Sequence, residues 1–75
     1  MATSKSVADL KPGEKAIISG FKDEQMSLKL LEMGCLPGTE VSINFKAPLG
    51  DPISIDVAGY NLSLRLNEAA TITIR

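Results

Sequence analysis

A length of 75 residues predicts a single domain. With 8 Lys and Arg against 9 Asp and Glu the net charge is −1, so no strong electrostatic field attracts nucleic acid or anionic lipid. The single Cys and the absence of His exclude a disulfide within the chain and remove the usual ligands of zinc and iron sites, so no cofactor or metal site is expected. No stretch resembles the apolar region of a signal peptide or a membrane span, so we expect a cytoplasmic protein.

The N-terminal part is predicted to contain a turn and a first strand. Residues 1–6 are expected to be disordered, and Pro-Gly dipeptides follow at 12–13 and 37–38. Proline presets φ at the second position of a β-turn and glycine supplies the positive φ at the third, so both dipeptides predict type II turns that lead into strands. The β-rich stretch 16–21 is the first predicted strand.

The period of the apolar residues then changes to that of a helix over residues 22–33. Asp23 is placed to cap its first turn, and Met26, Leu30 and Met33 recur at i, i+4 and i+7. Further leucines widen the apolar arc beyond what one buried face needs. Two interpretations stay open: the helix is buried on most sides, or some of its Met and Leu side chains are exposed for a partner.

A glycine, the lone cysteine and the second turn follow the helix. Gly34 is placed to end the helix in the left-handed conformation. Cys35 has no neighbouring cationic residue that would activate a thiolate, so we interpret it as a small apolar packing residue rather than as a nucleophile.

Period-two alternation of apolar side chains dominates the second half of the chain. It predicts strands over 40–46, 53–57, 62–66 and 72–74, with a turn at 58–61 and one helical turn at 67–70. Residues 47–52 contain two prolines and a glycine, which predicts a loop. The side chains predicted to point into the core are Ala16, Ile18, Val41, Ile43, Phe45, Ile53, Ile55, Val57, Leu62, Leu64, Leu66, Ile72 and Ile74.

The predicted fold is therefore mainly β, a small closed β-barrel of about five antiparallel strands with one short α-helix, in a single domain over residues 1–75. Closure removes the exposed strand edges that so short a chain cannot cover in another way.

No catalytic constellation is visible in the sequence. Asp51, Asp56 and Glu68 could cluster for acid-base chemistry or a hard cation, but nothing in their spacing forces them together. Arg65 is either a solvated cation on the outer side of a strand or an arginine finger acting on another protein. An RNA-binding barrel is disfavoured by the acidic pI of about 5.2. We therefore expect a binding module and not an enzyme.

Four segments in one order resemble the FeoA family: LKPGE (10–14), LLEMGCLPGTEV (30–41), APLGDPI (47–53) and GYNLSLRLNEA (59–69). The resemblance implies an SH3-like β-barrel that regulates ferrous iron uptake by binding the cytosolic GTP-binding part of the membrane transporter FeoB. It also implies recruitment to the inner face of the membrane through that partner. Self-association stays open. An alternative is an SH3-like module of the iron-dependent repressor type, acting in metal-responsive transcription.

A hypothesis for the partner-binding surface combines the helix with the loop at 47–52. Methionine adapts to irregular contacts, and no alternation assigns Leu49 to the core. Leu49 either forms part of this surface or folds back to plug one end of the barrel. The residues proposed for partner binding are Met26, Lys29, Leu30, Met33, Pro48, Leu49 and Asp51.

Overall fold

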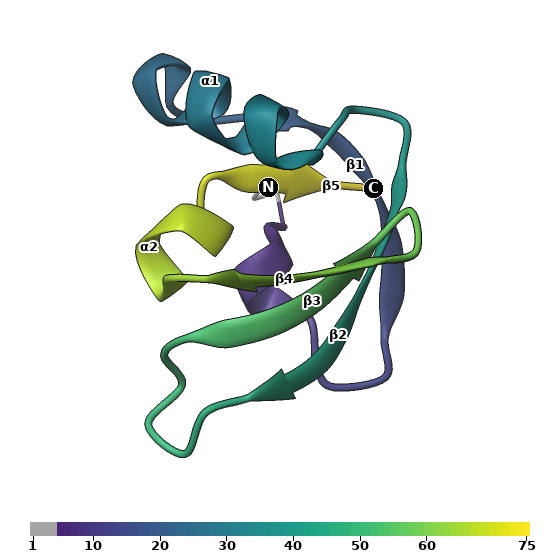
Figure 1. The fold of residues 1–75 in the computed structure, drawn as a ribbon, viewed down its shortest axis with the longest axis vertical. Coiled ribbons are helices and arrows are strands. Elements are labelled where there is room, and N and C mark those ends of the chain that lie inside the picture. Colours follow the sequence, from purple (N-terminus) through teal and green to yellow (C-terminus); the bar gives the residue numbers. More distant parts are fainter. Residues whose placement is uncertain (1–4) are drawn as a thin grey trace.

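A computed structural model of the chain describes residues 5–75 (Figure 1). In chain order its elements are a 3-10 helix η1 (Val7–Asp9), β1 (Lys15–Phe21), α1 (Glu24–Met33), β2 (Glu40–Lys46), β3 (Ile53–Val57), β4 (Tyr60–Leu64), α2 (Leu66–Ala69) and β5 (Ile72–Ile74). The mainly β composition, the five antiparallel strands and the short helix are confirmed.

The five strands form one sheet in the order β4-β3-β2-β1-β5, with every neighbouring pair antiparallel. Full closure was the wrong expectation, because β4 and β5 are not hydrogen-bonded neighbours among residues 5–75. The outer edge of β5 instead meets the N-terminal segment, where Ser6 bridges Thr73 and the Ile74 N–H donates to the Lys5 carbonyl at 3.1 Å. This segment, with η1, and α2 lie between β4 and β5 (Figure 1).

Residues 1–6 were expected to be disordered; residues 1–4 lie outside the described residues, and the expectation is wrong for Lys5 and Ser6, which contact β5. Ser6 is 4% exposed, and its N–H donates to Asp9 Oδ2 at 2.8 Å at the start of η1. The described part of the N-terminus is therefore part of the barrel.

Both Pro-Gly dipeptides form hydrogen-bonded turns with glycine in the left-handed region. Gly13 has φ of 89° in a turn closed by Glu14 N–H to Lys11 O at 2.9 Å. Gly38 has φ of 90° in a turn closed by Thr39 N–H to Leu36 O at 3.1 Å. Positive φ at the third position is what the sequence predicted.

The alternating residues of the strands fill the core, and the N-terminal segment adds to it. Ala16, Leu62 and Ile74 are half-buried and pack on its margin. Val7 and Leu10, in and just after η1, are buried although no sequence pattern indicated them. The buried apolar residues are Val7, Leu10, Ile18, Leu30, Cys35, Val41, Ile43, Ile53, Ile55, Val57, Leu64, Ala69 and Ile72.

Phe45 was wrongly predicted to point inward, and a β-bulge explains the error. Ile43 lies opposite Ile55, yet Phe45 lies opposite Ser54, so Asn44 is one residue more on β2 than on β3. Because side chains alternate along a strand, one extra residue moves every later side chain to the other face. Phe45 is therefore 60% exposed. Lys46 takes the inward register instead, and its Nζ donates to Ala8 O at 3.1 Å.

Leu66 was also wrongly predicted as a core strand residue. Strand β4 ends at Leu64, and Leu66 is the first residue of α2, where it is 41% exposed. Arg65 lies between the two elements as the N-cap of α2, so it is not on a strand either. The strand ends here because the backbone changes from extended to helical.

Candidate partner-binding surface

Helix α1 is capped at Asp23 and ends at Gly34 as its sequence predicts, and it begins at Glu24, two residues later than the predicted range 22–33. Asp23 Oδ1 accepts hydrogen bonds from the N–H groups of Gln25 and Met26, at 2.9 and 3.2 Å, and so satisfies two donors of the first turn. Gly34 has φ of 105° at the C-terminus, and its N–H returns to the last turn of the helix. A short helix with both ends satisfied positions its side chains in fixed directions.

The side chains of α1 divide between the core and solvent. Leu30 is fully buried, and Met26 and Met33 are half-buried and pack against the core. Leu28 is the exposed apolar residue, at 68%. The first interpretation of the wide apolar arc therefore describes most of the helix, whose apolar side chains pack against the core. Leu28 is the apolar side chain that faces solvent.

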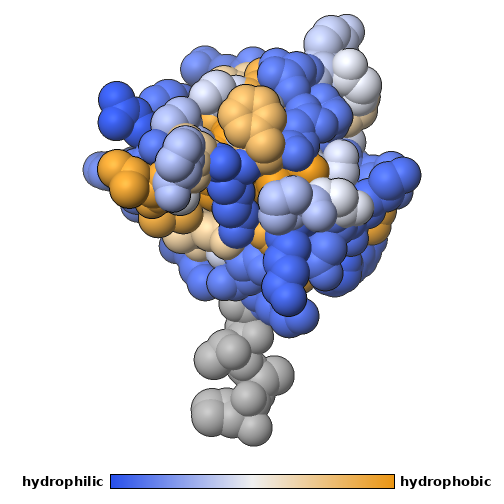
Figure 2. Space-filling model, turned by 90° about the horizontal axis from the view of Figure 1, so that it is seen from below, coloured by the Kyte–Doolittle hydropathy of each residue, from blue (hydrophilic) through white to orange (hydrophobic). Residues whose placement is uncertain are grey.

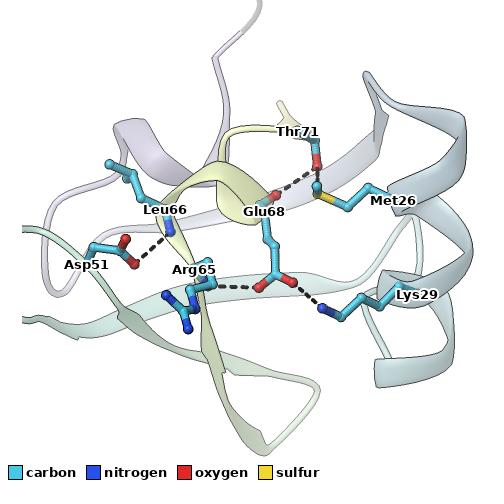
Figure 3. Close-up of polar contacts among 7 residues, drawn as sticks. All are labelled: Met26, Lys29, Asp51, Arg65, Leu66, Glu68 and Thr71. Carbon is cyan, nitrogen blue, oxygen red and sulfur yellow. Dashed lines mark hydrogen bonds and ion pairs between the residues drawn. The ribbon is translucent and has the colours of Figure 1, made fainter.

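A polar cluster joins α1 to α2, and we call it the α1–α2 clamp: Met26, Lys29, Glu68 and Thr71 (Figure 3). Lys29 Nζ forms an ion pair with Glu68 Oε2 at 2.5 Å, and the Arg65 N–H donates to Glu68 Oε1 at 2.8 Å. Thr71 Oγ1 donates to the Glu68 carbonyl at 2.8 Å and lies 3.6 Å from Met26 Sδ. The sequence had assigned Met26 and Lys29 to a partner, whereas here Lys29 contacts Glu68 of α2 and Met26 contacts Thr71 just after α2.

Glu68 is the most constrained carboxylate of the clamp. Its side chain is 9% exposed, against 63% for Lys29. The hydrogen bond from Lys29, followed by that from the Arg65 backbone, holds the pKa of Glu68 below its ordinary value although burial opposes this. The buried carboxylate is therefore charged at neutral pH and fully paired.

Cys35 is a core residue with no exposed surface. Burial, and secondarily the charge of Glu68, raises the pKa of its thiol above the ordinary value. Since the thiolate is the reactive form, this environment suppresses nucleophilic chemistry. The packing interpretation of Cys35 is confirmed.

The loop at 47–52 presents its side chains to solvent. Leu49 is 94% exposed, so it does not plug the barrel, and Pro48 and Asp51 are exposed as well. The loop is nevertheless held at its base, because the Ala47 N–H donates to the Pro52 carbonyl at 3.0 Å. Asp51 Oδ1 also accepts the N–H of Leu66 at 3.0 Å, which attaches the loop to the start of α2 (Figure 3).

The structure does not join the helix and the loop into one surface. Figure 1 shows α1 at one end of the longest axis and the β2–β3 loop at the other, on a molecule 32 Å in its longest dimension. The face seen from the loop end carries separate apolar patches among polar side chains (Figure 2). The sequence did not reveal two exposed apolar residues near this loop. Phe45 lies in β2, just before the loop, and Leu66 begins α2, where its N–H donates to Asp51 of the loop. A bulge signal at Asn44 would have been needed to find the first.

The three carboxylates considered for acid-base chemistry or a cation do not lie together. Asp51 bonds the Leu66 backbone, Asp56 lies 3.4 Å from Asn61 Nδ2, and Glu68 pairs with Lys29. Within residues 5–75 no three Cys, Asp or Glu side chains are grouped as metal ligands. None of the described helices has the length and apolar character needed to cross a membrane.

Comparison with known proteins identifies a family. The model of the FeoA domain matches residues 5–75. A curated relative from Porphyromonas gingivalis, a fusion of Fe(2+) transport protein A with the Fe(2+) transporter FeoB, is 33% identical over 69 residues. That alignment covers 91% of this chain but only 8% of the relative, which is therefore a much longer protein.

Solved structures show the same fold. The solution structure of a FeoA-like protein from Clostridium acetobutylicum is 36% identical, with a TM-score of 0.89, and the match covers 100% of this chain and 88% of that one. A zinc complex of Stenotrophomonas maltophilia FeoA, described as an SH3 domain protein, is 24% identical with a TM-score of 0.81, covering 93% and 88% of the two chains. A manganese-dependent transcriptional repressor shares the fold at 13% identity and a TM-score of 0.86, over 100% and 42% of the two chains. The SH3-like fold expected from the sequence is confirmed.

Proposed function

The chain belongs to the FeoA family of ferrous iron transport proteins, and we propose that it acts as an accessory protein that binds the cytosolic part of a FeoB-type transporter. The observation that carries the proposal is the Porphyromonas gingivalis relative, in which a FeoA unit and FeoB share one polypeptide. Fusion keeps two units at high effective concentration, which favours pairs that work in contact. The proposed location is the cytoplasm, at the inner face of the membrane when the partner is bound.

The proposed action is binding and not catalysis. The chain contains no His, its one thiol is buried and protonated, and its buried carboxylate is paired with Lys29. General acid-base and nucleophilic catalysis both need an accessible group of suitable pKa. The exposed apolar side chains, in contrast, suit a protein interface.

For the contact itself we propose the β2–β3 loop as the main element, with Pro48, Leu49 and Asp51 facing the partner. Leu49 is an exposed leucine on a loop that is held at its base. The loop therefore loses little conformational entropy when it binds. The outer side of α1 would contribute through Lys29 as a second contact at the other end of the molecule. Leu30 has no exposed surface, and Met26 and Met33 support the helix from within.

Co-purification with the cytosolic domain of a FeoB tests the proposal. The complex should form at micromolar concentrations and change the rate of GTP hydrolysis or nucleotide release by that domain. Size-exclusion chromatography of each protein alone would show whether this chain also self-associates. Absence of a complex with both a FeoB cytosolic domain and full-length FeoB in detergent would end the proposal.

A pair of leucine variants tests the loop. Leu49→Asp should weaken the complex by about tenfold or more, because a charge would be buried in an apolar contact. Leu36→Asp is the matched control, since Leu36 is 51% exposed and lies outside both proposed segments. Both variants should unfold at the same temperature as the wild type. Equal binding by the two variants would remove Leu49 from the interface.

The repressor-type alternative has weaker support. The likeness to the manganese-dependent repressor is one of fold at 13% identity, and this chain spans 42% of that protein. Because one fold serves many functions, we keep the transporter partner as the proposed function.

A further inference from the structure

A solvent-open cavity of about 390 Å³ lies away from the residues so far assigned to the partner. It is bounded by the N-terminal segment, the start of β1 and the end of β5. Leu10 is buried, and Ala16 and Ile74 are half-buried, so they form an apolar floor. The full set of lining residues is Lys5, Leu10, Glu14, Lys15, Ala16, Ile74 and Arg75.

The rim of this cavity concentrates positive charge. Lys5, Lys15 and Arg75 line it together with the Glu14 side chain and the main-chain carboxylate of Arg75, an excess of one positive group in a chain whose net charge is −1. The ion pair found within residues 5–75 is Lys29–Glu68, so none of these three cations is paired with a carboxylate of the described chain. The cavity therefore favours an anionic ligand.

The backbone beside the cavity offers a second feature. Ile17 and Arg75 exchange both of their backbone hydrogen bonds, at 2.9 and 3.2 Å. Because donors and acceptors of an antiparallel strand face the same side at every second residue, the N–H and C=O of Lys15 face that side too. The register of β5 against β1 covers Ile18 to Phe21, so no described strand lies beside Lys15. An extended peptide can pair there by strand addition.

We propose that this cavity binds an acidic peptide segment of the transporter partner that carries an apolar side chain between its carboxylates. The backbone of the segment pairs with Lys15, its apolar side chain rests on Leu10, Ala16 and Ile74, and its carboxylates meet the basic rim. A volume of this order holds one large side chain together with part of a backbone. The inference rests on the proposed function for the identity of the partner, but the cavity chemistry can be tested without it.

The direct test uses the full chain, labelled with ¹⁵N, and synthetic peptides. A peptide of alternating Glu and Leu should shift the amide resonances of Lys15, Ala16, Ile74 and Arg75 and slow hydrogen exchange at the Lys15 amide. A peptide with Gln in place of every Glu should bind about tenfold or more weakly, and binding of the acidic peptide should weaken as salt rises. Equal binding of the two peptides, or shifts confined to residues 47–52, would overturn the inference. Equal shifts with free glutamate would also overturn it, since they would show an anion site without peptide recognition.

Charge reversal supplies the matched variants. The double variant Lys15→Glu with Arg75→Glu should weaken the acidic peptide by about tenfold or more, and Lys22→Glu, an exposed lysine outside the cavity, should change it by less than about twofold. Ala16→Leu fills the floor and should also weaken the peptide, with thermal unfolding showing that the chain still folds. If the wild type binds a FeoB cytosolic domain and the double variant binds it equally well, the inference fails and the proposed function stands. If the wild type binds no FeoB but binds the acidic peptide, the proposed function fails and the cavity chemistry stands.

Discussion

The two ends of the molecule use leucine in opposite ways. At the α1 end, Leu30 is fully buried, and the α1–α2 clamp holds the helix above it. At the loop end, Leu49 is 94% exposed and makes no contribution to the core. Leu30 belongs to the periodic apolar face of α1, which faces the core. Leu49 lies in a loop bounded by proline and glycine, where no periodic pattern directs its side chain inward. The difference teaches that apolar residues serve stability at one end and remain available for association at the other.

The variant with the largest expected effect on stability is Leu30→Ala, which tests the buried side of this contrast. Removal of a fully buried leucine side chain should lower the free energy of unfolding by about 2 to 5 kcal/mol. Urea denaturation followed by circular dichroism measures the change. A loss below about 1 kcal/mol would mean that α1 is not part of the cooperative core, and the contrast would fail.

The clamp is tested next, by Glu68→Gln. This variant removes the charge that Lys29 pairs with and should cost about 1 to 2 kcal/mol at pH 7. The pKa of Glu68 is lower in the folded chain than its ordinary value of 4.5. The wild type therefore has this added stability above about pH 5 and loses it as the pH falls through the folded pKa. The variant has no carboxylate at this position, so its stability should not show this part of the decrease in acid. Denaturation curves at several pH values measure it.

Glu32→Gln is the control for the clamp, because Glu32 is an exposed carboxylate on the same helix. It should change stability by no more than about 0.5 kcal/mol. Equal effects of the two glutamine variants would show that the α1–α2 contact is a surface ion pair of little consequence.

A smaller test compares two carboxylates that accept backbone N–H groups. Asp23 accepts two at the start of α1, and Asp51 accepts one at the start of α2. Asp23→Ala should cost about 1 kcal/mol, and Asp51→Ala about half of that, since it serves a helix of a single turn. Thermal unfolding in parallel compares them. The reverse order would mean that the loop is the more strongly held end.

The smallest expected effect is at the loop tip. Leu49→Ala should leave the free energy of unfolding within about 0.5 kcal/mol of the wild type, because the side chain has almost no buried contact to lose. Chemical denaturation measures this. A loss comparable to that of Leu30→Ala would show that the loop closes onto the barrel in solution.

Much of the fold could be predicted because local signals and the global arrangement agree. The cap at Asp23, the stop at Gly34 and the two Pro-Gly turns depend on neighbouring residues, and all are found. Phe45 could not be placed, since alternation within β2 says nothing about an extra residue relative to β3. Closure was overestimated because a strand count does not reveal that an N-terminal segment occupies the edge of β5.

The candidate sites were harder to predict, since they depend on side chains far apart in the sequence. Lys29 and Glu68 are 39 residues apart, and their pairing follows from the packing of α1 beside α2. Lys5, Lys15 and Arg75 reach one cavity only because β5 returns beside β1. The exposure of Leu49 could be suspected from its loop, but its choice between solvent and barrel needed the structure.

The extra residue at Asn44 makes the surface chemistry of β2 depend on how this strand pairs with β3. If Asn44 were instead paired and the bulge lost, the ring of Phe45 would turn toward the barrel and the ammonium group of Lys46 away from it, whereas deletion of Asn44 would leave both side chains on their present faces. Residues inserted between Pro48 and Gly50 would only lengthen a solvent-facing tip. Relatives that lack the extra residue should therefore keep the same faces of this strand, and relatives with a longer loop should differ only in how far the tip extends.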